Sequence, residues 1–106
     1  HIMTVAENVI SRPIYRVLQK MTHESRIDVA LSIAVKELIR LRLKETAEQR
    51  NFFESKYGMP FELFRARFEA EAIPNQYGYS VESDYQAWES AVTDEESLRE
   101  LEDTLL

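Results

Sequence analysis

Apolar side chains recur every three or four positions along most of the chain, which is the spacing of one face of an α-helix. The first such segment covers residues 12–22 and follows Ser11 and Pro13, residue types that favour a helix start. Its apolar positions are Ile14, Val17, Leu18 and Met21. Residues 4–11, which precede it, are compatible with either a short strand or a frayed helix.

A much longer helix is predicted after Ser25. No Gly or Pro occurs over residues 26–57, and Gly58 is a natural helix end. At the standard rise per residue this helix is roughly 45 Å long, more than the diameter of a globule of this size. Its apolar stripe is too broad for one short helix to bury, so we expect a second copy of the chain to cover it. The predicted dimer interface consists of Ile27, Leu31, Ala34, Leu38 and Leu41.

The second half of the chain predicts shorter helices. Pro60 favours a helix over residues 60–72, which ends at Ile73-Pro74. Residues 75–80 are predicted to form a loop. Two capping-box patterns follow, and they predict a helix that begins near Ser83 and kinks near Thr93.

These elements together predict an all-α fold with a long central helix and shorter flanking helices, assembled as a helical dimer. The tripeptide His1-Ile2-Met3 has the character of a cloning remnant. Residues 4–58 are then an N-terminal helical dimerisation region, and residues 59–106 are an acidic, aromatic partner-binding region.

Charge is distributed unevenly along the chain. Residues 1–50 contain 9 Lys and Arg against 6 Asp and Glu, whereas residues 51–106 contain 4 against 13. This asymmetry suggests two surfaces with different partners, although an acidic half can also serve only to keep a protein soluble. A basic row of Lys36, Arg40 and Lys44 could contact nucleic acid, but mixed charge on a long helix is also typical of a face exposed to water.

The sequence offers little for catalysis. It contains no cysteine, and His23 is the only histidine outside the leading tripeptide. Glycine-rich phosphate loops and nucleophile elbows are also missing from the sequence. We therefore predict a protein that is not an enzyme and has neither a cofactor nor a metal site. No apolar run approaches the ~20 residues of a membrane span and no signal peptide is visible, which favours a cytoplasmic protein of a prokaryote.

Aromatic and acidic residues are interleaved after the predicted loop. Tyrosine and tryptophan are favoured anchors of protein interfaces, and carboxylates around them suit a basic partner. Internal packing is the alternative for Tyr85 and Trp88. The predicted partner-binding residues are Tyr79, Glu82, Asp84, Tyr85, Trp88 and Glu89.

Two segments within residues 50–90 resemble the C-terminal half of small prokaryotic antitoxin-like proteins of type II toxin–antitoxin pairs. They are Lys56-Tyr57-Gly58-Met59 with Phe61-Glu62 and Phe64, and Tyr79-Ser80-Val81-Glu82-Ser83-Asp84-Tyr85 with Trp88-Glu89. This resemblance implies that the C-terminal half binds and neutralises a cognate toxin protein.

The N-terminal half loosely resembles ribbon-helix-helix repressors, whose dimers place paired strands in the major groove of DNA. Residues 4–11 lack the alternating basic and polar residues that would read bases, so we expect no DNA binding by this protein alone. Three functions remain open: an antitoxin-type interaction protein, a self-associating structural or adaptor bundle, and a DNA-binding autorepressor.

Overall fold

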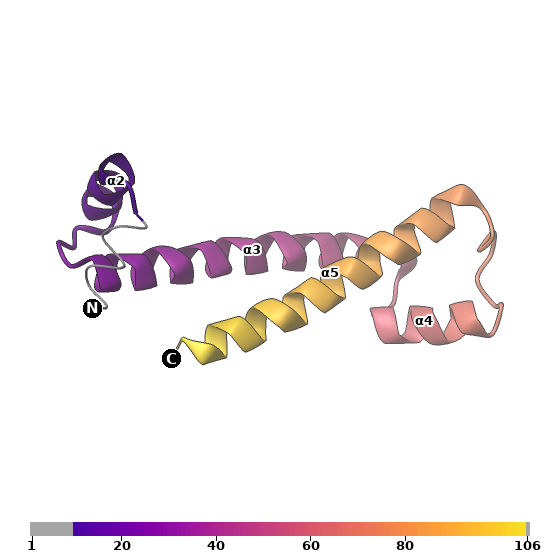
Figure 1. Ribbon diagram of the computed structural model, residues 1–106. Helices are drawn as coiled ribbons and strands as arrows, with labels where there is room; N and C mark the ends of the chain where they lie inside the picture. Colours follow the sequence, from indigo (N-terminus) through magenta and orange to yellow (C-terminus); the bar gives the residue numbers. More distant parts are fainter. Residues whose placement is uncertain (1–9, 106) are drawn as a thin grey trace. The chain divides into compact units, whose positions relative to one another are not determined.

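The structure is a computed structural model that describes residues 10–105. All of the regular elements in this range are helices: α2 (Arg12–Thr22), α3 (Ile27–Tyr57), α4 (Phe61–Glu69) and α5 (Tyr79–Thr104) (Figure 1). The all-α prediction is therefore confirmed. Residues 4–9, part of the segment that was predicted as either strand or frayed helix, lie outside the described residues.

The helix boundaries that depend on local signals agree with the sequence. The bounds of α2 are those predicted, and the long helix α3 ends at Tyr57. The next residue, Gly58, has a φ of 69°, a left-handed conformation that glycine adopts without steric cost. Its N–H donates to the carbonyl oxygen of Glu54 at 2.8 Å, which satisfies one of the last carbonyls of the helix.

The predicted start of α5 near Ser83 is wrong. One helix runs from Tyr79 to Thr104, so it begins before Ser83 and continues through Thr93. Both capping-box patterns lie in its interior, where the backbone N–H groups already have intrahelical acceptors. The first turn is closed instead by the N–H of Glu82, which donates to the carbonyl oxygen of Gly78 at 3.1 Å.

The connection between α4 and α5 is organised by Gln76, a polar side chain that is 4% exposed. Its Oε1 accepts from the N–H of Ile73 at 3.1 Å, and its Nε2 donates to the carbonyl oxygen of Phe68 at 3.0 Å. The amide thus replaces backbone partners that an irregular segment lacks. It also holds the loop where the side chain of Ile73 enters the core.

The chain divides into two compact units, one formed by the residues up to Leu38 and the other by Ile39–Thr104. The division falls within α3 and not at Gly58, where the sequence predicted a change of region. Each unit is described by itself.

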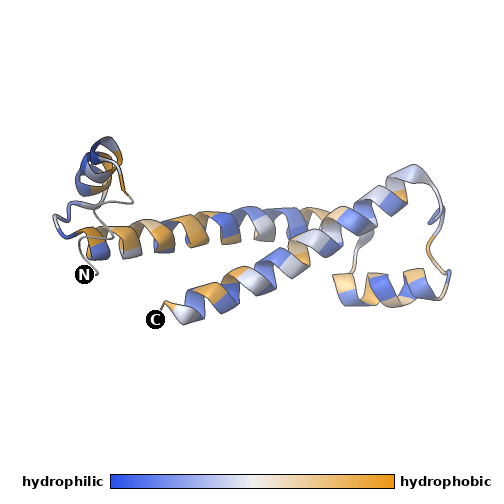
Figure 2. Cartoon of the chain, viewed as in Figure 1, coloured by the Kyte–Doolittle hydropathy of each residue, from blue (hydrophilic) through white to orange (hydrophobic). Residues whose placement is uncertain are grey.

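In the first unit, the hydroxyl of Tyr15 donates to the carbonyl oxygen of Ser25 at 2.6 Å, which ties α2 to the turn before α3. Ile27 and Ala30 are buried. Apolar residues are frequent on the first half of α3 (Figure 2). Several large apolar side chains of this unit remain exposed: Ile14, Val17, Met21, Ile33, Val35 and Leu38.

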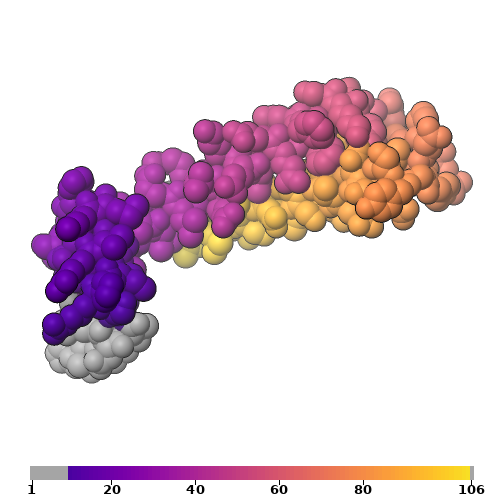
Figure 3. Space-filling view, turned by 90° about the horizontal axis from the view of Figure 1, so that it is seen from above, coloured from indigo at the N-terminus to yellow at the C-terminus, as the bar shows by residue number. Residues whose placement is uncertain are grey.

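In the second unit, α5 returns alongside the C-terminal part of α3, and the two helices lie side by side in two views (Figures 1 and 3). The short helix α4 packs against α5. The core between the three helices consists of Phe53, Phe61, Phe64, Ile73 and Trp88.

Candidate partner-binding surface

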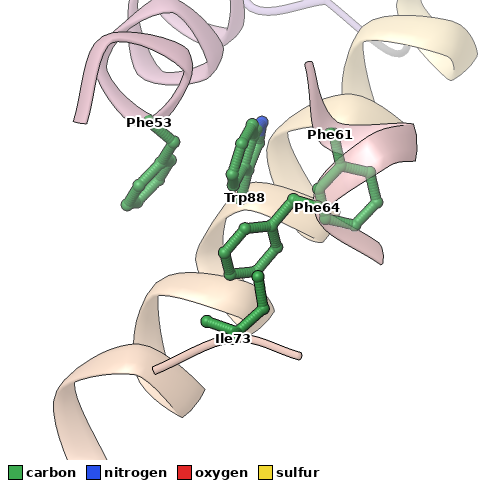
Figure 4. Close-up of a cluster of buried hydrophobic side chains, with 5 residues drawn as sticks. All are labelled: Phe53, Phe61, Phe64, Ile73 and Trp88. Atoms are coloured by element: carbon green, nitrogen blue, oxygen red, sulfur yellow. The ribbon is translucent and has the colours of Figure 1, made fainter. Parts of the chain in front are cut away.

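The centre of the second unit is the side chain of Trp88, which is 0% exposed (Figure 4). Its ring centroid lies 5.8 Å from that of Phe53 and 5.7 Å from that of Tyr57, both on α3. On the opposite side it lies 5.3 Å from Phe61 and 5.0 Å from Phe64, both on α4. These separations are those of favourable aromatic pairs, so Trp88 joins three helices into one core.

Internal packing is therefore the alternative that the structure shows for Trp88, and this residue presents no surface to a partner. Tyr85, which is half-buried, extends the same core. Its ring centroid lies 4.5 Å from that of Phe68 and 5.6 Å from that of Phe61. The sequence could not distinguish these roles because the aromatic partners lie on other helices.

The carboxylate of Asp84 also forms hydrogen bonds within the chain. Its Oδ2 accepts from the Nζ of Lys56 and from the hydroxyl of Tyr57, both at 2.6 Å. Burial raises the pKa of Asp84, but the hydrogen bonds from Lys56 and Tyr57 outweigh it and hold the pKa below its ordinary value. Burial and the bond to Asp84 together raise the pKa of the Tyr57 hydroxyl. This cluster fixes the start of α5 to the end of α3.

Two further carboxylates of α5 bind other helices of the unit. Glu89 Oε2 accepts from an Arg65 guanidinium nitrogen at 3.1 Å, which links α5 to α4. Glu95 Oε1 accepts from Arg50 Nε at 3.2 Å, and Arg50 also donates to Glu54 at 2.8 Å. Hydrogen-bonded charge pairs of this kind are stronger than neutral hydrogen bonds. Three acidic side chains of α5, those of Asp84, Glu89 and Glu95, are thus used in contacts within the unit.

The six predicted partner-binding residues do not form one surface. Only Tyr79, which is 89% exposed, and Glu82 face outward without a role in the core. Tyr77 is exposed nearby, and its hydroxyl donates to the Glu71 carboxylate.

The residues of the predicted dimer interface differ in how exposed they are. Ile27 is buried within its own chain, and Leu31 and Ala34 are half-buried. Leu38 and Leu41 are each 53% exposed. The three basic residues proposed for nucleic-acid contact, Lys36, Arg40 and Lys44, are all exposed.

The last eleven residues of α5, residues 94–104, contain several carboxylates that the fold does not use. Within the described part of the chain, five carboxylates of this segment take part in no ion pair: Asp94, Glu96, Glu100, Glu102 and Asp103. The last turn of the helix contains no basic residue. Negative charge is unfavourable at a helix C-terminus, where the macrodipole is itself negative. Leu101 lies among these residues and is 54% exposed.

A groove of about 500 Å³ runs between α3 and this acidic segment. Arg42, Glu45, Thr46 and Gln49 form its α3 side, and Asp94, Ser97 and Leu98 form its α5 side. The Arg42 guanidinium is already paired with Glu45 at 3.1 Å. None of these residues was predicted from the sequence to form a site.

The described residues contain no cluster of three or more His, Asp or Glu side chains able to hold a metal ion. Of the helices that the structure describes, none combines the length and apolar character required to cross a bilayer.

No protein-family model, curated protein or solved structure shows significant similarity to this chain.

Proposed function

We propose that this chain is an antitoxin-type interaction protein that self-associates and uses the acidic distal part of α5 to bind and neutralise a basic cognate toxin. The observation that carries the proposal is the set of five carboxylates in Asp94–Asp103 that have no ion-pair partner among the described residues. The resemblance of residues 50–90 to antitoxin-like proteins supports the same function.

The position of these charges supports a role in binding. Glu96 and Glu100 are four residues apart, and Glu100 and Asp103 are three apart, so they are like-charged neighbours on one helix. They also oppose the macrodipole at the C-terminus of α5. Solubility alone does not require acidic residues at the one end of the helix where they are unfavourable. A partner with lysines or arginines would relieve both repulsions.

The proposal is tested by comparing how well wild type and two charge variants of this protein neutralise the toxin. The product of the adjacent gene is expressed alone and with this protein, and both growth arrest and binding affinity are measured. The variant E100Q/E102Q/D103N removes three charges from α5, while E48Q/E62Q/E69Q removes three exposed charges elsewhere.

We expect the α5 variant to lose affinity by about tenfold or more, since three exposed ion pairs are lost, and the control to change it by less than about threefold. Equal losses would show that only the net charge matters. A neighbouring product that neither binds nor arrests growth would refute the antitoxin function.

Self-association is proposed from the first unit. Six of its large apolar side chains are exposed, including Ile14 at 58% and Met21 at 76%. We expect Leu38→Glu to convert a dimer to monomer in sedimentation at micromolar concentration. Leu63→Glu, at a comparably exposed position on α4, should leave the dimer intact, and a monomeric wild type would refute self-association.

A further inference from the structure

The groove between α3 and α5 in the second unit is open on one side, and its lining comes from these two helices alone. Two helices packed over their whole length leave no such space, because each helix fills the grooves of its neighbour. Here the aromatic core holds the pair together around Trp88, and the groove lies farther along, next to Asp94 and Leu98.

The α5 side of the groove includes one apolar side chain. Leu98 lines the groove and is half-buried. Leu101 follows three residues later on the same side of the helix and is 54% exposed. Two leucines at this spacing are the contact that one amphipathic helix offers to another.

The charge around these leucines is negative. Of the three charged residues that line the groove, Arg42 and Glu45 neutralise each other, whereas Asp94 has no ion-pair partner among residues 10–105. A ligand that fills this groove therefore needs cationic side chains next to aliphatic ones.

We propose that the groove binds a basic amphipathic helix of the partner protein. The helix would lie against α3 and α5 as the third member of a bundle, with aliphatic side chains on Leu98 and Leu101 and a lysine or arginine at Asp94. This inference rests on the proposed function and locates its contact surface. A second α5 is a poor occupant because it would bring like charges together.

The proposal is tested with the full chain and a synthetic helical peptide that has leucine at its core positions and lysine elsewhere. A peptide with glutamate in place of lysine is the control. Affinity is measured by fluorescence polarisation at physiological ionic strength for wild type, Asp94→Lys and Glu96→Lys. Both variants change the charge of α5 equally, but Glu96 lies two residues farther along the helix and so faces away from the groove.

We expect the lysine peptide to bind and the glutamate peptide not to bind. Asp94→Lys should weaken binding by about tenfold or more, and Glu96→Lys by less than about threefold. Equal losses in the two variants would overturn the proposal, because they would show that net charge alone attracts the peptide. A change in the sedimentation of Asp94→Lys would also overturn it, because a second copy would then occupy the groove.

The groove and the proposed function can fail separately. If the adjacent gene product binds Asp94→Lys as tightly as wild type but loses affinity for E100Q/E102Q/D103N, the function stands and the groove is not the contact. If that product binds neither protein, the antitoxin function fails, and the peptide titration still decides whether the groove accepts a basic helix.

Discussion

Truncation of Trp88 to alanine should remove most of the stability of the second unit. The side chain is fully buried, and replacing a buried Trp or Phe by Ala typically costs about 3–5 kcal/mol. Trp88 contacts four rings at centroid separations of 5.0–5.8 Å, which places the expected loss in the upper part of that range. A unit of this size has a total stability of about 3–10 kcal/mol.

Two matched variants show whether the loss of stability comes from the packing of the Trp88 ring. Trp88→Phe keeps an aromatic ring in the core and removes the indole N–H, which is buried and has no hydrogen-bond partner among the described residues. The loss of ring contacts and the removal of an unpaired donor oppose each other, so the net change should be about 1 kcal/mol. Tyr79→Ala truncates an aromatic ring that is 89% exposed and should change stability by less than about 0.5 kcal/mol.

The assay is urea and thermal unfolding followed by far-ultraviolet circular dichroism, which does not depend on the mutated chromophore. In the wild type, Trp88 is the single tryptophan, so its fluorescence reports on this core alone. We expect Trp88→Ala to lower Tm by about 12 °C or more, if it remains folded at all. A Trp88→Ala protein as stable as Tyr79→Ala would refute the assignment of Trp88 to the core.

The remaining predictions concern polar groups that join the helices. Asp84→Asn should cost about 1–2 kcal/mol at neutral pH in urea unfolding, whereas the exposed neighbour variant Glu82→Gln should be silent. The folded-state pKa of Asp84 lies below its ordinary value, so its carboxylate should stabilise the fold above about pH 4. This stabilisation should be lost as the pH falls further. The acid-induced loss of stability should therefore be smaller in Asp84→Asn. The pKa of Tyr57 is raised, so its hydroxyl should stabilise the fold fully below about pH 10 and less as the pH rises above it. Tyr57→Phe should remove this loss of stability at alkaline pH. Gln76→Ala should cost about 1–3 kcal/mol because it leaves a buried N–H and a carbonyl without partners, while Gln86→Ala at an exposed position should not; equal stability of the two variants would contradict the role of Gln76.

Features controlled by neighbouring residues were predictable from the sequence. The end of α3 at Gly58 requires only a residue that tolerates positive φ, and the start of α2 at Arg12 follows from Ser11 and Pro13. The all-α class follows from the spacing of apolar residues over long segments without Gly or Pro. These signals act within one or two helical turns, so they do not depend on how the rest of the chain packs.

Features controlled by distant residues were not predictable in the same way. A capping box at Ser83 favours a helix start there, but the α5 backbone is already helical from Tyr79, and Val81 in this first turn packs against the aromatic core. Likewise, Trp88 has few aliphatic neighbours in sequence, yet its ring partners Phe53 and Phe61 come from other helices. Local composition indicated an exposed aromatic segment where tertiary packing forms a core.

The candidate partner surface lies farther along α5 than the sequence predicted. Charge counting treats all nine carboxylates of this helix alike, but Asp84, Glu89 and Glu95 are paired with cations more than twenty residues away in sequence. The last of these three pairs along α5 is that of Glu95, and the adjacent residue Asp94 is the first residue of α5 that lines the groove. Beyond this point Leu101 is exposed, and five carboxylates have no ion-pair partner among residues 10–105. A basic amphipathic partner would supply both the apolar cover and the cations, whereas in the first part of the helix Asp84 and Glu89 already have cations from within the chain.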